Sequence, residues 1–374
     1  MGGVAASGGQ RENVTEIQIQ GRKFLIDGAP TYRGVTHRGK PVEGLLLNSR
    51  MVQAIFDDEN PATAHRWRYP DTGVWDPDRN TDEFCAALPE YRRHGLLAVT
   101  VGLQGGGSVF RPEVFDHYVN SAFDRHGALK PAYADRLRRV LDAADAAGMV
   151  VIANYLYWRQ IDKLEGDAAV RRAVEEATDW LLRTGHRNIL VDVVNEFHPG
   201  QGLLRAEGIH ELIEIVQRTT VGGRRLLASA SVHPESLLPG GRWQTVQDFY
   251  LPHGNDLWAD ELRQALRRIQ DSPPFSTNPR PILINEDSIH LDSLEAAVGE
   301  YASWGYYSQG YGCGGWQHGR FDWPARGRED RYQDLSGFQT VPVNWSINTP
   351  AKRAFFDRVA AITGATGESD RPTL

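Results

Sequence analysis

The sequence is poor in cysteine, has no long apolar run and carries no excess of positive charge. Its 374 residues include only two cysteines, Cys85 and Cys313, which excludes a disulfide-rich scaffold and favours a reducing compartment. No segment is apolar enough to cross a bilayer, and the N-terminal residues lack the pattern of a secretion signal. A formal net charge of −7 argues against nucleic acid or an anionic membrane as a partner. We therefore expect a cytoplasmic protein, while composition leaves its oligomeric state open.

The common nucleotide-binding fingerprints are also missing. No GxGxxG motif follows the first expected strand, and no P-loop pattern (GxxxxGK followed by Ser or Thr) occurs anywhere. These glycine-rich loops bind phosphate groups through backbone N–H groups, so their absence argues against the dinucleotide-binding and P-loop classes. We expect no cofactor.

Aromatic residues, in contrast, are plentiful outside the periodic segments. The chain has 10 Trp and 13 Tyr, and several of them lie beside polar residues in irregular stretches, including Trp67, Tyr69, Trp75, Tyr155 and Trp316. Flat rings near loops are typical platforms for sugar rings, which offer C–H faces for stacking. For any single aromatic residue, however, packing in a large core is the preferred interpretation, and only the clustering beside polar residues favours a sugar platform.

The first 80 residues predict a hairpin, one strand and a long insertion. Residues 15–24 alternate between apolar and polar types, which predicts a short β-hairpin. We expect residues 32–36 to form the first barrel strand and residues 37–80 to form a long insertion after it. We also expect a disordered N-terminus over 1–12, a single catalytic domain over 13–364 and a flexible tail over 365–374.

From residue 81 onward, helical and strand patterns alternate. Apolar residues at i, i+3 and i+4 predict helices over 81–94, 132–147, 168–184, 209–220, 259–270, 293–304 and 350–362. Short apolar runs without alternation predict strands over 97–101, 149–153, 189–194, 226–229, 244–249, 281–284 and 305–308. With the strand at 32–36, eight βα units favour an α/β fold, a closed (β/α)8 TIM barrel, over an open sheet.

Two glutamates follow expected strands on opposite sides of this barrel. The fourth strand ends in Asn195 and Glu196, and the seventh ends in Asn285 and Glu286. Active sites of such barrels lie at the carboxyl ends of the strands. Two facing carboxyl groups suit glycoside hydrolysis, in which one protonates the leaving oxygen and the other attacks the anomeric carbon. A gap of about 5–5.5 Å predicts retention of configuration, and about 6.5–9.5 Å predicts inversion.

These residues resemble a large clan of retaining (β/α)8 glycosidases, which includes the cellulase, mannanase and β-galactosidase families. The resemblance covers residues 31–362 and rests on Asn-Glu after strand four, Glu after strand seven and Trp316 after strand eight. It implies that Glu196 is the acid/base and Glu286 the nucleophile. It also implies that Asn195 hydrogen-bonds the sugar 2-hydroxyl and that Trp316 forms the floor of the subsite.

The sequence departs from the clan at several strand ends. The clan usually has a Tyr near the end of strand six that bonds to the nucleophile, and here Tyr250 and His253 are both candidates. It often has an Arg after strand two and a His after strand three, but here Gln104 follows strand two, and Asn154 and Tyr155 follow strand three. The candidates for the missing basic groups lie in the expected first insertion and include His37, Arg38, His65, Arg66 and Arg68.

The preferred interpretation is a retaining glycosidase that acts on a small glycoside or oligosaccharide and needs no metal. Two alternatives remain open. One is a metal-dependent sugar isomerase or epimerase in which Glu196, Asp248, His253 and Glu286 bind one divalent ion. The other is a non-catalytic barrel that binds sugar.

Overall fold

The computed structural model describes residues 14–106, 118–197, 202–233, 241–255, 257–309, 331–339 and 342–365. The expected disordered segment 1–12 and all but residue 365 of the expected tail lie outside these residues. No helix in the described part of the chain is both long and apolar enough to span a membrane.

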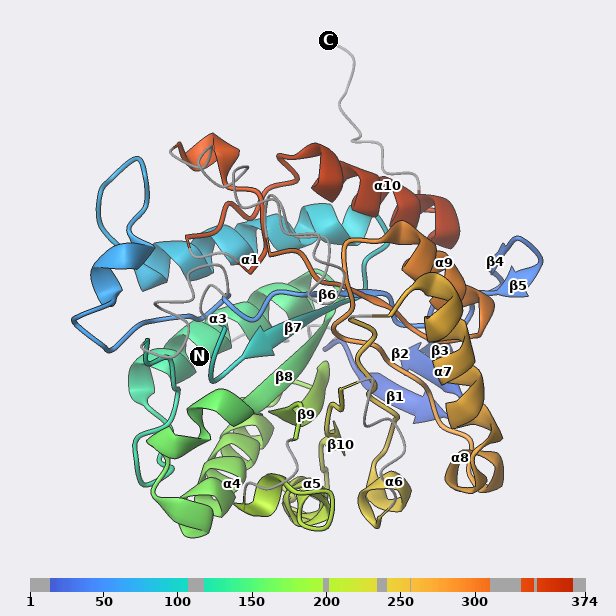
Figure 1. Cartoon of the computed structure of the whole chain (residues 1–374), viewed down its shortest axis with the longest axis horizontal. Helices are drawn as coiled ribbons and strands as arrows, with labels where there is room; N and C mark the ends of the chain where they lie inside the picture. The colour runs from blue at the N-terminus through green and yellow to red at the C-terminus, as the bar shows by residue number, and fades with distance from the viewer. Residues whose placement is uncertain are drawn as a thin grey trace, which may run out of the picture.

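The centre of the molecule is a parallel sheet (Figure 1). Six strands have the order β10-β9-β8-β7-β6-β11: β6 (Asn48–Arg50), β7 (Ala98–Gly102), β8 (Val150–Tyr157), β9 (Ile189–Asn195), β10 (Leu227–Ser229) and β11 (Gly305–Tyr306). Three further parallel bridges complete the ring, namely Val232 to Pro252, Tyr250 to Ile282 and Leu283 to Ser303. The described residues therefore form the expected (β/α)8 barrel, in which short bridged segments take the places of strands six and seven.

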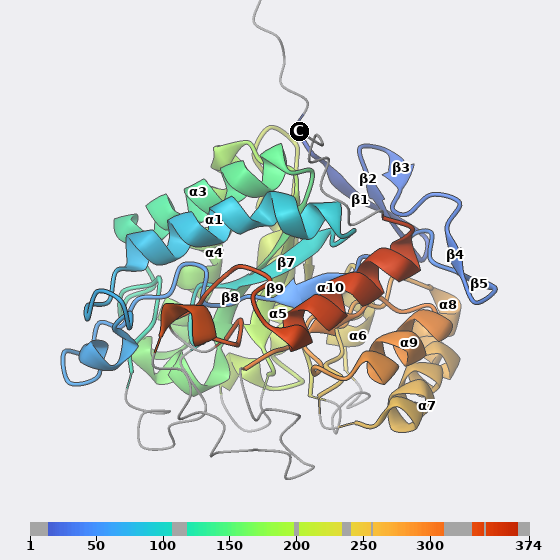
Figure 2. The ribbon, with the colours of Figure 1, turned by 90° about the horizontal axis from the view of Figure 1, so that it is seen from above.

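Helices surround this barrel (Figures 1 and 2). They are α1 (Pro77–Arg93), α3 (Pro131–Ala146), α4 (Gly166–Thr184), α5 (Ile209–Arg218), α6 (Trp243–Val246), α7 (Ala259–Asp271), α8 (Pro273–Thr277), α9 (Leu291–Gly299) and α10 (Pro350–Thr363). Local chemistry sets several ends. The Asp76 carboxylate caps α1 by accepting from the N–H groups of Asp78 and Arg79, and α4 stops at Gly185, whose φ of 86° suits glycine.

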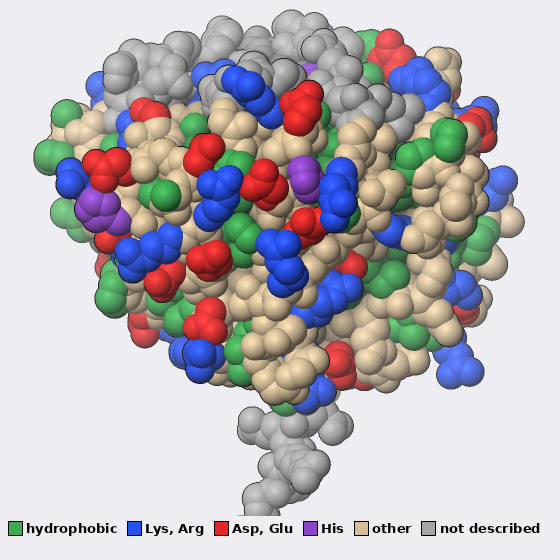
Figure 3. Space-filling model, turned by 90° about the horizontal axis from the view of Figure 1, so that it is seen from below, with side chains coloured by type: hydrophobic (Ala, Val, Ile, Leu, Met, Phe, Trp, Pro, Cys, Tyr) green, Lys and Arg blue, Asp and Glu red, His purple; other side chains and the backbone are tan. Residues whose placement is uncertain are grey.

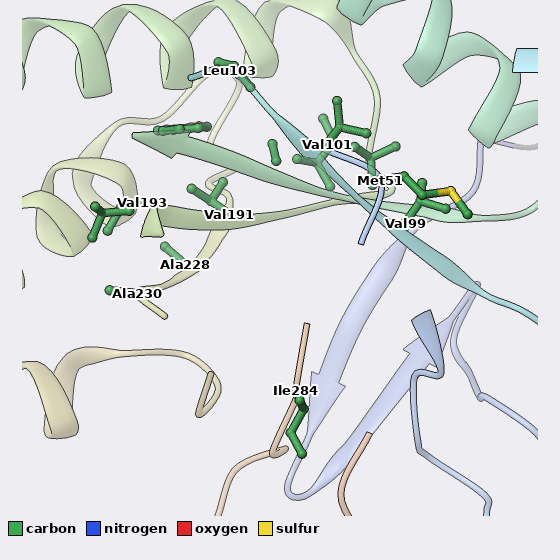
Figure 4. Packing of buried hydrophobic residues seen from close by; sticks show 14 of the residues in the cluster. Met51, Val99, Val101, Leu103, Val191, Val193, Ala228, Ala230 and Ile284 are labelled. Atoms are coloured by element: carbon green, nitrogen blue, oxygen red, sulfur yellow. The ribbon is translucent and has the colours of Figure 1, made fainter. Parts of the chain in front are cut away.

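Alternate residues of the barrel strands divide between two cores. On β7, for example, Val99 and Val101 pack in the large outer core beneath the helices, whereas Ala98 belongs to an inner cluster. Figure 4 shows outer-core residues from β7, β9 and β10. The inner cluster fills the lower barrel with residues such as Leu46, Val150, Ile152, Leu190, Phe249, Leu251 and Leu283. Successive side chains of a strand point to opposite faces, so only every second residue of a barrel strand can face the barrel axis.

The expected N-terminal hairpin closes the bottom of the barrel. It consists of β1 (Ile17–Gln20) and β2 (Lys23–Ile26), joined by the short β3 (Ala29–Pro30) in a three-stranded antiparallel sheet. The Ile17 N–H donates to the carbonyl of Arg187 at 3.0 Å, just before β9. Phe24 is fully buried in the inner cluster and meets the Phe249 ring edge-on at 6.2 Å. The hairpin therefore seals the end of the barrel opposite the carboxyl ends of the strands.

The structure corrects the expected first strand and insertion. Residues 32–36 do not enter the barrel, because residues 31–34 form turns and β4 (Thr36–His37) pairs with β5 (Lys40–Pro41) in a small projecting hairpin (Figure 2). The first barrel strand is β6, inside the expected insertion. The apolar run Leu45–Leu47 leads into β6. The strand itself consists of polar residues, beginning with Asn48 and Ser49, so a pattern based on apolar runs does not detect it.

One other expectation about a segment is also wrong. Residues 243–246 form α6, so the sixth barrel segment starts later than the expected strand at 244–249. Trp67 and Tyr69 are buried, so for these two residues core packing is the correct interpretation. Trp67 joins Phe56 and Tyr118 in a small separate core, and Tyr69 stacks on Trp75.

The outer surface of the helices carries mixed charge. Acidic and basic side chains are interspersed over the face seen in Figure 3. Several form ion pairs between neighbouring elements, such as Arg139 of α3 with Asp82 of α1 and Arg171 of α4 with Glu211 of α5. Exposed pairs of this kind contribute only about 0–1 kcal/mol each, so packing of the two cores holds the fold together.

The role of the hairpin in sealing the barrel can be tested at Phe24. Phe24→Ala should lower the free energy of unfolding by about 3–5 kcal/mol, because it opens a cavity in the inner cluster. Chemical denaturation followed by circular dichroism measures the effect. Val74→Ala is the matched control, since Val74 is 60% exposed, and should change stability by less than about 0.5 kcal/mol. An equal effect of both substitutions would contradict the proposed role of Phe24.

Candidate active site

Three strand ends bring Glu196, His253 and Glu286 together. Glu196 directly follows β9, His253 follows the bridged residue Pro252, and Glu286 follows the short strand segment at 282–284. One carboxylate oxygen from each glutamate and one imidazole nitrogen lie within 4.8 Å of one another. The two acidic groups expected to face each other across the barrel mouth are thus in close proximity.

Glu286 is held by one ion pair and one hydrogen bond from other strands. The Arg50 Nε lies 2.8 Å from the Glu286 Oε2, and the Asn255 Nδ2 donates to the Oε1 at 3.0 Å. Arg50 ends β6, and Asn255 lies two residues after His253. All three side chains are almost fully buried. Ion pairs and hydrogen bonds of this kind compensate a buried carboxylate for its lost hydration, so Arg50 and Asn255 fix the position of Glu286.

Glu196 has a different environment. Its Oε1 lies 2.8 Å from the His253 Nδ1, while the same nitrogen is 3.6 Å from the Glu286 Oε2. The Glu196 side chain is 18% exposed and that of Glu286 is 8% exposed, so Glu196 is the more accessible of the two. The Glu196 backbone has a φ of 52°, in the left-handed region that side chains other than glycine rarely adopt.

His253 and Glu196 form a coupled ion pair. Burial alone would raise the pKa of the Glu196 carboxyl, but the hydrogen bond and charge of His253 outweigh it and lower the pKa. Burial acts against protonation of His253, yet the neighbouring charges of Glu286 and Glu196 raise its pKa above the ordinary value. The site therefore places the Arg50 guanidinium and the His253 imidazole against the carboxyl groups of Glu286 and Glu196.

Asn195 directly precedes Glu196 in the chain. It is buried at the end of β9, and its Oδ1 accepts a hydrogen bond from the Arg50 Nη2. Several buried polar atoms around it have no hydrogen-bond partner among the described residues, namely Arg50 Nη1, His253 Nε2 and Asn255 Oδ1. Unpaired buried donors and acceptors are rare in folded proteins, so their convergence here indicates a site for a polar ligand.

Three of the expected binding residues face away from the mouth. Tyr155 points into the outer core and shares a hydrogen bond with Thr178 of α4. Tyr250 packs in the same core against Phe275, and its neighbours Phe249 and Leu251 face the axis instead. His37 lies on the β4–β5 hairpin, where it pairs with Glu295 at 2.9 Å. The predictions that these residues contact substrate are therefore wrong.

Gln104, Asn154 and Arg66 do not reach the glutamates either. Gln104 uses both ends of its amide inside the protein, since it donates to Ser121 and accepts from the Tyr157 N–H. Asn154 faces the axis but binds Asp192 below the mouth. Arg66 lies on η1 (Ala64–Trp67), and no hydrogen bond or ion pair in the described part of the chain joins it to Glu196 or Glu286. Trp316 falls outside the described residues.

Sequence reasoning missed Arg50 and Asn255. Residue 50 fell within the expected insertion, so it was not considered as a polar residue at the end of a barrel strand. The apolar run Leu45–Leu47, followed by polar residues, is the signal that could have identified it. It also stopped at His253 after strand six, where the segment His253–Gly254–Asn255 places a second polar side chain at the same edge. Arg50, on the first barrel strand, is therefore a basic side chain in contact with Glu286.

The coupling of the two site residues makes a testable prediction. His253→Gln should raise the pKa of the Glu196 carboxyl, because burial then acts without an opposing imidazolium. Glutamate-selective ¹³C NMR measures the titration, and loss of the corresponding signal in Glu196→Gln assigns it. The control is His65→Gln, since His65 is exposed and should leave Glu196 unaffected. An unchanged Glu196 titration in His253→Gln would show that the ion pair does not control its charge.

Comparison with solved structures finds glycoside hydrolases, at low sequence identity. A GH5-4 broad specificity endoglucanase from Bacteroides salanitronis is 14% identical, with a TM-score of 0.52 over 86% of this chain and 93% of that chain. A family 5 lichenase from Caldicellulosiruptor sp. F32, in complex with cellotetraose, is 12% identical, with a TM-score of 0.51 over 95% of this chain and 100% of that one. No protein-family model and no curated protein sequence matches the chain. The likeness thus shows the fold, which is the barrel architecture of family 5 glycoside hydrolases.

Proposed function

We propose that the protein is a retaining glycoside hydrolase that acts on a small glycoside or oligosaccharide. The observation that carries the proposal is the pair of carboxylates at the barrel mouth, with oxygens of Glu196 and Glu286 no more than 4.8 Å apart. Retaining glycosidases keep their two carboxyl groups about 5–5.5 Å apart, whereas inverting enzymes need about 6.5–9.5 Å to admit a water molecule. The spacing supports a double displacement with a covalent glycosyl-enzyme intermediate.

Glu286 suits the role of nucleophile. Arg50 and Asn255 fix the orientation of its carboxylate, so that one oxygen can attack the anomeric carbon. The attack displaces the leaving oxygen and forms an ester between Glu286 and the sugar. Water then attacks the same carbon from the opposite side and releases Glu286, so that two inversions restore the original configuration.

Glu196 suits the role of acid and base because a proton is already at hand. In the free protein this proton sits on the hydrogen bond between the His253 Nδ1 and the Glu196 Oε1, which are 2.8 Å apart. When it resides on Glu196, the carboxyl group can protonate the leaving oxygen of the substrate. Afterwards the Glu196 carboxylate accepts a proton from the attacking water. In this scheme His253 acts as a proton reservoir between the two steps.

The unpaired polar atoms of the site fit a sugar. Arg50 Nη1 is a donor, Asn255 Oδ1 is an acceptor, and His253 Nε2 takes either role according to its protonation state. A polyhydroxylated ring satisfies all of these types at once. The neighbouring folds support the substrate class, since they include an endoglucanase and a lichenase bound to cellotetraose.

The three converging groups also have the spacing of a metal site, which raises the rival isomerase function. The described residues fit this rival less well. Arg50 already lies 2.8 Å from the Glu286 Oε2, so a divalent cation there would face a like charge. Asp248, the expected fourth ligand, lies instead against Arg225 and the N–H of Ala228 outside the barrel. Turnover of an aryl glycoside that persists undiminished in excess EDTA would separate the glycosidase from the metal-dependent isomerase.

Substitution of the nucleophile tests the proposal directly. Glu286→Ala should lower kcat on an activated aryl glycoside by at least about 10⁴-fold while the protein stays folded. Azide should restore part of the activity, because the small anion can enter the space of the missing carboxylate. The product would then have the inverted configuration, since one displacement replaces two, and NMR of the glycosyl azide measures it.

A half-buried glutamate far from the site provides the control for this experiment. Glu295→Gln changes a side chain that pairs with His37 and Arg358 on the outer surface, so it should leave kcat unchanged. If Glu286→Gln turned over the same substrate at the wild-type rate, Glu286 would not be the nucleophile. A wild-type protein that is inactive on every member of a broad panel of aryl glycosides, furanosides included, would argue for the non-catalytic sugar-binding barrel.

A further inference from the structure

Below the barrel mouth, one buried carboxylate binds residues from three other strands. Asp192 lies on β9 and is fully buried on the axis side of the barrel. Its Oδ1 accepts the Ser231 N–H at 2.9 Å, and its Oδ2 accepts from the Asn154 Nδ2 at 3.1 Å and from the Asn285 Nδ2 at 3.3 Å. A carboxylate is an acceptor only, so it can satisfy all three donors without a mismatch.

Ser231 connects Asp192 to Glu196. Its Oγ accepts the Glu196 N–H at 3.1 Å and donates to the carbonyl of Val194 at 3.0 Å. The Glu196 N–H is therefore held where the backbone adopts its left-handed φ of 52°. Such a conformation persists only where its surroundings fix it, and Ser231 is the residue that provides this constraint.

Asn285 connects the same carboxylate to the second glutamate. It directly precedes Glu286, and its side chain is fully buried with the amide on the Asp192 Oδ2. The carbonyl of Glu286 in turn accepts the Gly254 N–H at 2.9 Å, which ties strand seven to the segment that carries His253. Ser231, which contacts Glu196, and Asn285, which precedes Glu286, are thus both hydrogen-bonded to the Asp192 carboxylate.

We propose that Asp192 is a positioning residue that sets the distance between Glu196 and Glu286 by anchoring Ser231 and Asn285 on a single buried carboxylate. Asp192 itself lies beneath the reacting groups and acts through these two residues. The inference rests on the proposed function for its catalytic meaning, while its structural part stands on the hydrogen bonds of the described residues.

The charge of Asp192 adds a second effect. Burial raises the pKa of its carboxyl to about 6, although the nearby charge of His253, the Ser231 N–H and the charge of Arg50 each act in the opposite direction. Asp192 is thus ionised above this pH, and its negative charge favours the protonated form of His253. The other charged groups around His253 are Glu196, Glu286, Arg50 and Asp287.

The test compares Asp192→Asn with the control Asp248→Asn. Asn keeps the shape and one acceptor, but it presents an N–H group to the amides of Asn154 and Asn285. Asp248 also accepts a backbone N–H from a neighbouring strand at 2.9 Å, but on the outer face, away from the glutamates. Asp192→Asn should lower kcat by about 100-fold with a much smaller change in KM, because the glutamates lose their alignment. Asp248→Asn should leave both constants unchanged.

The dependence of kcat on pH distinguishes a positioning role of the charged Asp192 carboxylate from a general loss of protein stability. In the wild type, Asp192 takes up a proton as the pH falls through about 6, which weakens its acceptor role and contributes to the acidic limb of kcat. Asp192→Asn removes that titration and a negative charge near the glutamates, so the acidic limb should move to lower pH. An acidic limb that stays in place, with kcat equal to that of Asp248→Asn, would overturn the proposal.

One readout does not depend on activity. The pKa of the His253 imidazole, followed by NMR and assigned with His253→Gln, should fall in Asp192→Asn and stay constant in Asp248→Asn. Ser231→Ala is a milder second variant, which should lower kcat like Asp192→Asn while leaving the pKa of His253 unchanged, because the charge of Asp192 remains. If the wild type hydrolysed no glycoside, the proposed function would fail, and the His253 titration would still decide whether Asp192 acts on the site. An unchanged His253 titration in folded Asp192→Asn would overturn this inference alone.

Discussion

The structure depends on the alternation of side chains along strands that close into a ring. In such a ring one face of every strand meets the helices, and the other face has only the barrel axis to occupy. The lower axis is filled with apolar residues such as Val150 and Leu190, and the N-terminal hairpin seals it with Phe24. Higher up, the same inward positions carry Asn154, Asp192 and other polar residues. These inward-facing polar side chains line the mouth of the barrel.

This polar upper layer has to be electrically balanced. Moving a single charge out of water is costly, and a charge pair is tolerated only with good geometry and further hydrogen bonds. Here Arg50 and a protonated His253 offset Glu286 and Glu196. The site therefore forms an ion pair network in which several buried polar atoms, among them Arg50 Nη1, His253 Nε2 and Asn255 Oδ1, have no hydrogen-bond partner in the described part of the chain.

The sequence was sufficient to predict the fold and the two acidic residues. The runs before Glu196 and Glu286 are apolar, so a rule based on strand ends finds them, and β7, β8, β9 and β10 fall where the runs predict. It failed where strands are short or polar, as for β6 with Arg50. The prediction also failed where it mattered whether a side chain faces the barrel axis or the helices. A strand that is buried on both faces is apolar throughout, so its sequence does not show which residues face the axis. Tyr155 and Tyr250 were misassigned for this reason.

Closure of the ring links parts of the chain that are far apart in sequence. β6 bonds to β7 on one side and to β11 on the other, so Asn48 pairs with both Ala98 and Gly305. Contacts of such long range are slow to form, because chain entropy must be lost before the contact is made. During synthesis, β6 emerges long before its partner β11, so one edge of β6 stays unpaired until residue 305 has been made. An unpaired strand edge can pair with another chain, so this is the period in which the nascent protein would most need protection from aggregation.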